Sequence, residues 1–390
     1  MKGFLSSMWK VARRETGLIL RRPVYLLGSI GIVVVMALFF HTFFGEGLPQ
    51  DMPIGVVDSD GSTYSRMLGE ELDDTQLGRT VWYDDVHEAF RDLETGRIYG
   101  LLTIPKGFNE QVQSFRRPGL DVYVNTSYII GGALSYKDLV TMVNMANGAV
   151  QRQLMRAKGV PDDAIMASIM PISVDAHAIG NPETNYEYYL GNMMIPGVFA
   201  MCILLVIVYA LGSELKYGTS RHLLRTSDGS FSAAVYGKLL PYTLLFILLG
   251  SLIVLTLYCF WGYPLNGSLG CMVLAMIAMV LAYEALGVFL VGLVPNLRLA
   301  VCLSCLLSIL AFSLAGFTLP AEALPEGVRG LTWIFPLRYY YLIYVREAIY
   351  AGGFGLWWQY LLAMLAFGFL PAFVSRRLEN AYVNLDYPRN

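Results

Sequence analysis

Long stretches without charged residues constrain this chain more than any other feature. Pro23–Phe44 contains no Asp, Glu, Lys or Arg, and neither does the segment between Glu187 and Glu214. A helix needs about 20 mostly apolar residues to cross the hydrocarbon core of a bilayer. The whole chain is 55% hydrophobic and 15% charged, whereas soluble domains carry about 25% charged residues. The sequence therefore predicts an α-helical integral membrane protein.

Six transmembrane helices are expected. Leu239–Tyr283 is uncharged and long enough for two of them, and the turn-forming residues 262–267 divide it. An even number of spans places both termini on one side of the membrane. The expected spans are 23–44, the uncharged segment that begins near 189, 239–261, 268–293, 299–317 and 356–374.

Lys and Arg near the ends of spans indicate which side is cytoplasmic. Residues 1–22 hold six of them against the single acid Glu15, and further basic residues lie in 213–238 and in the tail 375–390. Both termini are therefore predicted to be cytoplasmic. Within 1–22, five residues recur at helical spacing and predict an amphipathic helix in the membrane interface: Phe4, Leu5, Met8, Trp9 and Ala12.

The segment 45–188 differs in kind from the rest of the chain. It holds 21 Asp or Glu against 11 Lys or Arg, and it alternates short apolar runs with polar helical stretches. This pattern predicts an extracytoplasmic α/β domain inserted between helices 1 and 2. Expected strands are 54–58, 80–83, 99–104 and 121–125, and expected helices are 62–72, 86–95, 108–115 and 135–158.

Motifs for catalysis or cofactor binding are missing from the sequence. Gly237-Lys238 is followed by Leu239 and has no phosphate-loop spacing around it. The five cysteines fall in predicted spans, and His41, His87, His177 and His222 are scattered, so no metal site is predicted. A net charge of −2 argues against nucleic acid as a partner. We expect neither catalytic residues nor a bound cofactor on this chain.

Two features inside or beside the spans are unusual. Glu284 lies within the fourth span, where a charge is costly, so it is either a polar point on a substrate path or an interhelix hydrogen-bonding group. In 318–353, prolines interrupt apolar pieces too short to span. We expect a re-entrant hairpin there, with Tyr339, Tyr340, Tyr341 and Tyr344 as interfacial anchors, and an ordinary loop is the alternative.

In its order of elements the chain resembles the permease subunits of type-two ATP-binding-cassette (ABC) exporters. Local motifs support the resemblance: 56–60 and Ile104-Pro105-Lys106-Gly107-Phe108 in the inserted domain, the run from Glu214 through Gly218-Thr219 to Leu223-Leu224, and Gly237–Pro241. Later elements are Gly316 to Pro320 and Pro336 to Arg346. The resemblance covers nearly the whole chain, with Tyr217-Gly218-Thr219 standing where many members have a proline-glycine pair.

The resemblance implies an exporter permease of the bacterial inner membrane. A separate cytoplasmic ATPase would bind ATP and Mg²⁺, and two permease copies or close homologues would form a dimer. Residues 213–238 would dock into the ATPase through Glu214, Gly218, Thr219, Leu223 and Leu224. Glu284 would belong to the translocation region, together with four residues of the re-entrant hairpin: Gly316, Pro320, Pro336 and Arg346. A periplasmic adaptor and an outer-membrane channel would be further partners of the outer domain.

Two other functions fit parts of the sequence. A membrane-anchored receptor or scaffold would use only the outer domain, and a proton-driven carrier would move substrate without an ATPase. A carrier is expected to show an internal repeat and several ionisable residues at mid-membrane, but Glu284 alone is evident. Apolar spans suit hydrophobic drugs, lipids or peptides equally, so the sequence does not identify the substrate.

Overall fold

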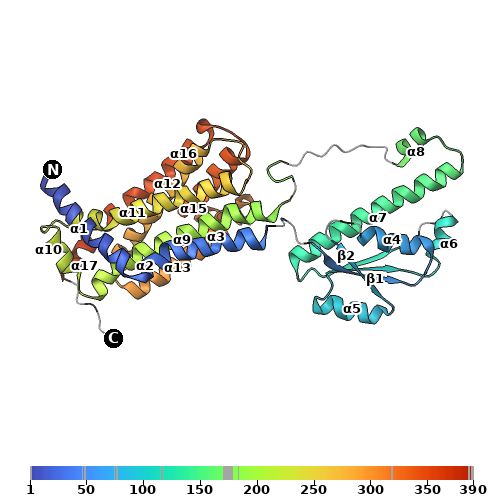
Figure 1. Ribbon diagram of the computed structural model, residues 1–390, viewed down its shortest axis with the longest axis horizontal. Coiled ribbons are helices and arrows are strands. Elements are labelled where there is room, and N and C mark those ends of the chain that lie inside the picture. Colours follow the sequence, from blue (N-terminus) through green and yellow to red (C-terminus); the bar gives the residue numbers. More distant parts are fainter. Residues whose placement is uncertain are drawn as a thin grey trace. The chain divides into compact units, whose positions relative to one another are not determined.

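The computed structural model describes residues 2–45, 47, 50–73, 75, 78–114, 116, 118–169, 179–182, 184–317, 319–384 and 387. The chain forms two compact units, which we treat separately (Figure 1). The helical unit comprises Met1–Gly45 and Ala178–Asn390, and the sheet unit comprises Glu46–His177. His177 itself lies outside the described residues.

In the helical unit, six helices of the described residues are long and apolar enough to cross a membrane, the number that the sequence predicts. Three of them combine adjoining elements, because single turns within them are wound more loosely or more tightly than an α-helix. The spans are α2-η1-α3 (Pro23–Leu26, Leu27–Gly31, Ile32–Phe43), α9 (Tyr186–Lys216), α11-η2 (Phe231–Leu255, Thr256–Phe260), α12 (Leu269–Leu293), α13 (Leu297–Leu314) and α16-η6-α17 (Phe354–Ala366, Phe367–Phe369, Leu370–Asn384).

Helices α9 and α12 form the centre of this unit, and both are largely buried inside the protein. Their close approach depends on small residues. A Cβ atom on Gly287 of α12 would lie 2.8 Å from Ile207 of α9, and one on Gly250 of α11 would lie 2.8 Å from Met276 of α12. The remaining spans keep broad apolar surfaces exposed, as lipid-facing helices do.

Helix boundaries differ from the sequence prediction at three places. Helix α11 begins at Phe231, eight residues before the expected 239, because Ser230 caps it by accepting a hydrogen bond from the amide of Ala233. Helix α9 continues to Lys216, so the expected segment 213–238 is helical at both ends. The last helix runs to Asn384 and includes much of the expected tail.

The N-terminal helix α1 (Lys2–Arg21) packs along α11. Its buried residues are Ser7, Val11, Ala12, Glu15 and Ile19. Of the apolar face predicted from the sequence, Ala12 is buried, whereas Phe4, Leu5 and Trp9 are exposed. The helix therefore packs on the protein through one stripe, and leaves Phe4, Leu5 and Trp9 of the predicted interfacial face exposed.

Residues 319–353 fold into short helical pieces: η3 (Ala321–Ala323), α14 (Glu326–Arg329), η4 (Gly330–Ile334), α15 (Pro336–Tyr344) and η5 (Val345–Ile349). Helix α15 packs against α12 and α16. Tyr340 and Tyr344 are buried in the protein, so they are core residues and not the interfacial anchors that we predicted. Tyr339 and Tyr341 are half-buried.

The sheet unit contains a four-stranded sheet whose strands match the four predicted ones. The order is β2-β1-β3-β4, with β1 parallel to β2 and β3, and β4 antiparallel to β3. The strands are β1 (Met52–Asp58), β2 (Gly78–Tyr83), β3 (Gly100–Ile104) and β4 (Asp121–Val124). Alternate residues of β1 serve two cores: Ile54 and Val56 face one, and Val57 faces the other.

Helices cover both faces of this sheet. In Figure 1, α5 (Val86–Thr95) lies on one face, and α4 (Thr63–Asp73) and α7 (Ile129–Ala157) lie on the other. The short α6 (Phe108–Gln113) joins the same core as α4 and α7. Helix α8 (Asp162–Ile169), which we did not predict, folds back on α7 and is held by an ion pair of 2.5 Å between Arg156 and Asp162.

Candidate functional site

The connection between α9 and α11 contains the segment in which the sequence places ATPase docking. Gly218, with φ of +67°, allows the chain to turn after α9. The amide of Thr219 then donates to the carbonyl of Glu214 at 2.9 Å. Helix α10 (Ser220–Thr226) follows, and a second turn with positive φ at Asp228 and Gly229 leads into α11. The described segment is thus a short helix between two tight turns.

A buried network of charges lies beneath this segment. The side chain of Lys238, on α11, is 1% exposed. Its Nζ atom lies 2.7 Å from Oε1 of Glu15 on α1 and 2.9 Å from Oε1 of Glu214 on α9. Arg14 Nη1 lies 2.9 Å from the same oxygen of Glu214, and the hydroxyl of Tyr242 donates to Glu15 at 2.9 Å. Each buried charge therefore has an opposite charge and further hydrogen bonds, which its burial requires.

This network is tied directly to the turn before α10. The hydroxyl of Thr219 donates a short hydrogen bond to Oε2 of Glu214. The same carboxylate thus receives Arg14 from α1, Lys238 from α11 and Thr219 from the turn. Any displacement of the turn changes contacts that α1 and α11 share.

Helix α10 is also held from two other sides. Ser7 of α1 donates to Oδ2 of Asp228 at 2.5 Å, and Lys10 Nζ lies 3.0 Å from that atom. The Ser7 hydrogen bond and Lys10 lower the pKa of the Asp228 carboxyl. On the other side, Ser220 donates to the carbonyl of Tyr382 at 2.9 Å, and Arg221 Nε donates to that of Val383 at 3.2 Å. Contacts with α1 and α17 therefore fix the orientation of α10.

The predicted docking residues divide into two groups. Gly218 and Thr219 are exposed and Leu224 is half-buried, so a partner can reach them. Leu223 is completely buried and Glu214 is 3% exposed. Both side chains are used inside the protein, Leu223 in the core and Glu214 in the network, so neither offers a contact to a partner in this conformation. The exposed face of α10 carries Arg221 and Arg225, whose spacing predicts a polar rim for the docking contact, together with His222.

Glu284 lies at the contact between α12 and α11. It is 5% exposed, and its Oε2 accepts a hydrogen bond of 2.7 Å from the hydroxyl of Thr243. Its Oε1 has no partner among the described residues. Of the two roles that the sequence allows for Glu284, the interhelix hydrogen bond is present.

Gly316 and Pro336 shape the start of the hairpin, whereas Pro320 is exposed. Gly316 has φ of +89°, and a Cβ atom there would lie 2.5 Å from a guanidinium nitrogen of Arg338. Arg338 is buried over the ring of Trp333, and its Nη1 donates to the carbonyl of Ala315 at 3.3 Å. Pro336 occupies the first turn of α15, where its missing amide costs nothing.

Arg346 and Glu347 hold the end of residues 319–353 through hydrogen bonds. Arg346 binds a backbone carbonyl, and Glu347 binds a backbone amide and an indole nitrogen. Arg346 Nη1 donates to the carbonyl of Leu356 at 2.8 Å. Glu347, 3% exposed, accepts from the amide of Ser268 at 2.8 Å and from Trp357 Nε1 at 2.8 Å. Ser268 precedes the first residue of α12, so this carboxylate also faces the positive end of that helix.

The residues that sequence reasoning missed are charged, and all but the half-buried Arg14 are buried: Arg14, Glu15, Lys238, Arg338 and Glu347. One signal was available. Glu15 is the single acid of the N-terminal basic segment, and Lys238 directly precedes a long uncharged stretch. Across the described residues, no group of three or more His, Cys, Asp or Glu side chains is arranged to hold a metal ion.

The chain is similar to known transport proteins. The family model described as "ABC-2 family transporter protein" matches residues 23–375. The chain is 23% identical over 319 residues to "Inner membrane transport permease YhhJ" of Escherichia coli strain K12, which covers 81% of this chain and 82% of the relative. It is 20% identical over 348 residues to "Probable multidrug ABC transporter permease YbhR" of the same strain, covering 87% and 90%.

A third relative, "Probable multidrug ABC transporter permease YbhS" of that strain, is 23% identical over 342 residues, covering 84% of each chain. The family match includes all but the two ends of the chain, and the relatives are matched over most of their length. The chain belongs to the ABC-2 transporter family, as a permease subunit of an ABC exporter in the bacterial inner membrane.

Proposed function

We propose that α10 and its two flanking turns are the docking surface for a cytoplasmic ATPase, and that both termini lie on that side. The observation that carries this proposal is the combination of an exposed basic face with a buried anchor. Arg221 and Arg225 lie on the surface one helical turn apart, while Leu223 and Thr219 tie α10 to the core and to the charge network. A displacement of α10 by a partner would therefore also displace the helices to which it is bound.

ATP binding would then act on the membrane helices through that network. Closure of two ATPases displaces α10, and Glu214, Lys238 and Glu15 pass the displacement to α9, α11 and α1. Nucleotide selects one of two conformations because it binds one more tightly. Two permease copies, or this chain with a close homologue, would form the path between them. ATP and Mg²⁺ would be held by the partner, and this chain would carry no catalytic residue.

The sheet unit would lie outside the cytoplasm, where its acidic surface would face a periplasmic adaptor and an outer-membrane channel. Its position in the chain supports this, since it follows α3 and precedes α9. Two relatives are named as probable multidrug permeases, and broad apolar surfaces on the spans suit a hydrophobic drug or lipid. We therefore propose a hydrophobic or amphipathic substrate.

Charge reversal on α10 tests the docking proposal. We expect the double variant Arg221→Glu/Arg225→Glu to lose co-purification with an ABC-type ATPase from native membranes, while its membrane insertion is unchanged. Both residues lie on the exposed face, so reversal leaves the buried network intact and breaks one orienting contact, the hydrogen bond from Arg221 to the carbonyl of Val383. Substitution of Leu223, which is completely buried, would damage the fold and is a poorer test.

A matched control is the double reversal Arg376→Glu/Arg377→Glu, which makes the same charge change at two exposed positions of α17. This control should keep the ATPase. If the α10 reversal retains the ATPase at the level of the unmodified protein, the docking surface lies elsewhere.

A further inference from the structure

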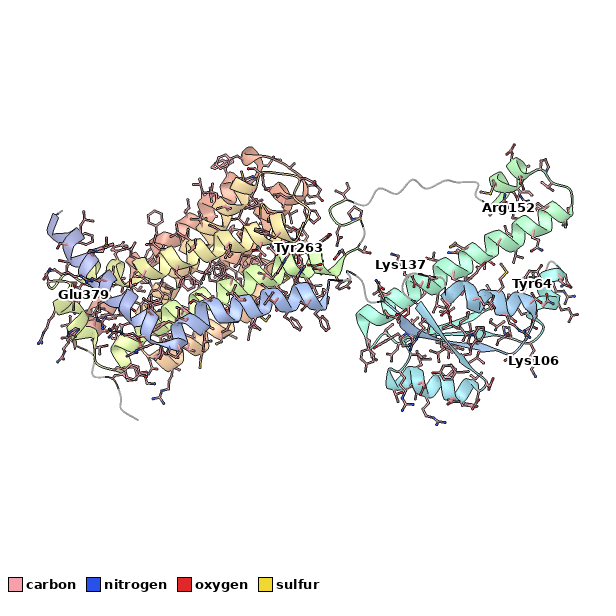
Figure 2. All side chains as sticks on the ribbon, viewed as in Figure 1. Tyr64, Lys106, Lys137, Arg152, Tyr263 and Glu379 are labelled. Atoms are coloured by element: carbon pink, nitrogen blue, oxygen red, sulfur yellow. The ribbon has the colours of Figure 1, made fainter. Side chains whose placement is uncertain are left out.

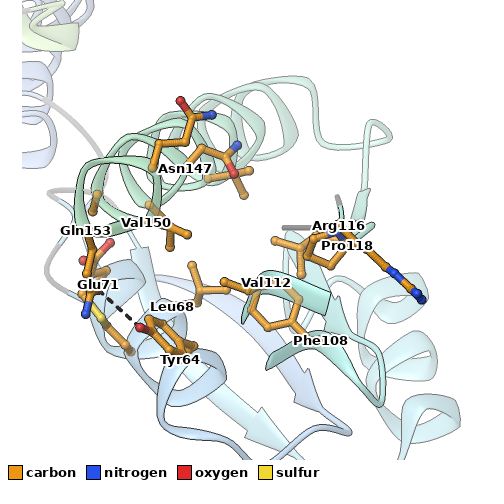
Figure 3. A pocket seen from close by; sticks show the side chains of 16 residues that line it. Tyr64, Leu68, Glu71, Phe108, Val112, Arg116, Pro118, Asn147, Val150 and Gln153 are labelled. Carbon is orange, nitrogen blue, oxygen red and sulfur yellow. Dashed lines mark hydrogen bonds between the residues drawn. The ribbon is translucent and has the colours of Figure 1, made fainter. Parts of the chain in front are cut away.

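A cavity of about 610 Å³ lies in the sheet unit between α4, α6 and α7. Figure 3 shows its lining side chains: Tyr64 and Leu68 come from α4, Phe108 and Val112 from α6, and Val150 from α7. This volume falls within the range of about 300–1,000 Å³ that sites for drug-sized ligands occupy.

Apolar side chains form the floor of the cavity. Leu68, Phe108, Val112 and Ala146 belong to the hydrophobic core on this face of the sheet, and each keeps a small exposed area that faces the opening. The hydrophobic core is therefore accessible at this place, because α7 does not cover the whole surface of α4 and α6. A ligand with an apolar body would complete this packing.

Polar side chains also contribute to the lining: Tyr64, Glu71, Arg116, Asn147, Gln151 and Gln153. The hydroxyl of Tyr64 donates to Oε1 of Gln153 at 3.3 Å, which links α4 to α7 on one side of the cavity (Figure 3). Pro118 lies toward the other side in the same view, and Asn147 lies on α7 above.

The charges around the cavity favour a neutral or cationic molecule. Glu71 is the acid of the lining, and Arg116 is its cation. In Figure 3 the guanidinium of Arg116 points away from the other lining side chains, so it does not neutralise the interior. The surrounding segment 45–188 has 21 acids against 11 basic residues, which raises the local concentration of cations.

We propose that this cavity binds a small amphipathic molecule with an apolar, branched or aromatic body and a neutral or cationic polar group. The proposal goes beyond the ATPase docking described above and does not depend on it. Binding requires neither nucleotide nor a partner chain, because every lining residue belongs to this unit.

Photolabelling of the full chain tests the site. The permease is placed in phosphatidylcholine nanodiscs without ATPase and irradiated with a benzophenone that carries a trimethylammonium group. Cross-linked peptides are located by mass spectrometry. We expect labels in 64–71, 108–120 and 143–153, and about tenfold weaker labelling of these peptides by the matched benzophenone carboxylate.

Filling the cavity supplies the decisive variant. Ala146→Trp and, separately, Val150→Trp should each reduce labelling of these peptides about tenfold, since both residues line the cavity. Thr141→Trp adds the same side chain at an exposed position of α7 outside the lining, and should label like the unmodified protein. If Ala146→Trp does not fold, Val150→Trp decides.

Each other outcome overturns part or all of the proposal. Labels that persist in both filled variants, or that fall only in the membrane spans, overturn the site. Equal labelling by the ammonium and carboxylate probes overturns the assigned charge class. Loss of ATPase docking in the α10 variant would leave these results unchanged, so the two proposals fail separately.

Discussion

The two ends of the helical unit fix their loops by different chemistry. Tyr263, in the turn between α11 and α12, and Glu379, on α17, mark these opposite ends in Figure 2. At the Glu379 end, side chains of opposite charge from three helices bind one another, with Lys238 between Glu15 and Glu214. At the Tyr263 end, Glu347 instead binds a backbone amide and an indole nitrogen.

Under the ATPase docking proposed above, this difference would determine which end transmits movement. A bond from Glu347 to the amide of Ser268 fixes a loop locally and keeps one arrangement. A carboxylate such as Glu214, shared by Arg14, Lys238 and Thr219, makes the positions of four segments depend on one another. At the end with the charge network, the helices would therefore move together, whereas residues 319–353 would keep one position.

The largest expected effect comes from removing the shared cation. Lys238→Met leaves Glu15 and Glu214 buried without their common partner, and loss of one member of a buried ion pair typically costs about 3–5 kcal/mol. We expect a marked fall in the thermal unfolding temperature in detergent. In the fraction that still folds, ATP hydrolysis stimulated by the permease should be lost, because α1, α9 and α11 no longer move together.

Two controls sharpen this prediction. Lys216→Met removes an exposed lysine at the end of α9 and should change little. The double variant Glu15→Gln/Lys238→Met removes one of the two acids, so it should recover part of the lost stability if the charges are coupled. If Lys238→Met unfolds at the same temperature as the unmodified protein, the buried charges do not stabilise the fold.

A smaller effect is expected at the hairpin. Glu347→Ala leaves the amide of Ser268 and the indole nitrogen of Trp357 without their acceptor, and each buried unsatisfied donor costs about 1–3 kcal/mol. The unfolding temperature should fall, but stimulated ATP hydrolysis per folded molecule should be kept. Glu326→Ala, at an exposed acid of the same hairpin, is the control. Loss of stimulated ATP hydrolysis per folded molecule in Glu347→Ala would remove the distinction between the two ends.

The spans and the strands could be predicted because each depends on a pattern within one short stretch. Continuous apolar runs mark the helices, and short runs of Ile, Val and Leu mark β1 and β3. Helix α8 does not follow from the sequence pattern, because a single completely buried residue, Ile165, and an exposed ion pair between Arg156 and Asp162 give no apolar periodicity.

The charge network could not be predicted for a different reason. Glu15, Glu214 and Lys238 are far apart in the chain, and nothing in their local sequence says that they meet. Glu214 was chosen from a motif, but as a contact for a partner, whereas it serves inside the protein. The motif likewise predicts Leu223 as a contact for the partner. Its sequence does not show which face of α10 is covered by α1 and α17.

The smallest effect is a pH dependence at the edge of the charge network. Ser7 and Lys10 lower the pKa of Asp228 below its usual value of 3.8. A carboxyl whose pKa is depressed on folding contributes stability that is complete above the unfolded pKa and is lost as the pH falls through the folded one. The contact between α1 and α10 should therefore be constant at neutral pH and weaken below about pH 4. Hydrogen exchange of residues 220–227, corrected for intrinsic rates, should show protection falling over that range in the unmodified protein. In Asp228→Asn, which cannot ionise, protection should be lower at pH 7 and should lack this transition, and an identical acid transition in both proteins would assign it to other groups.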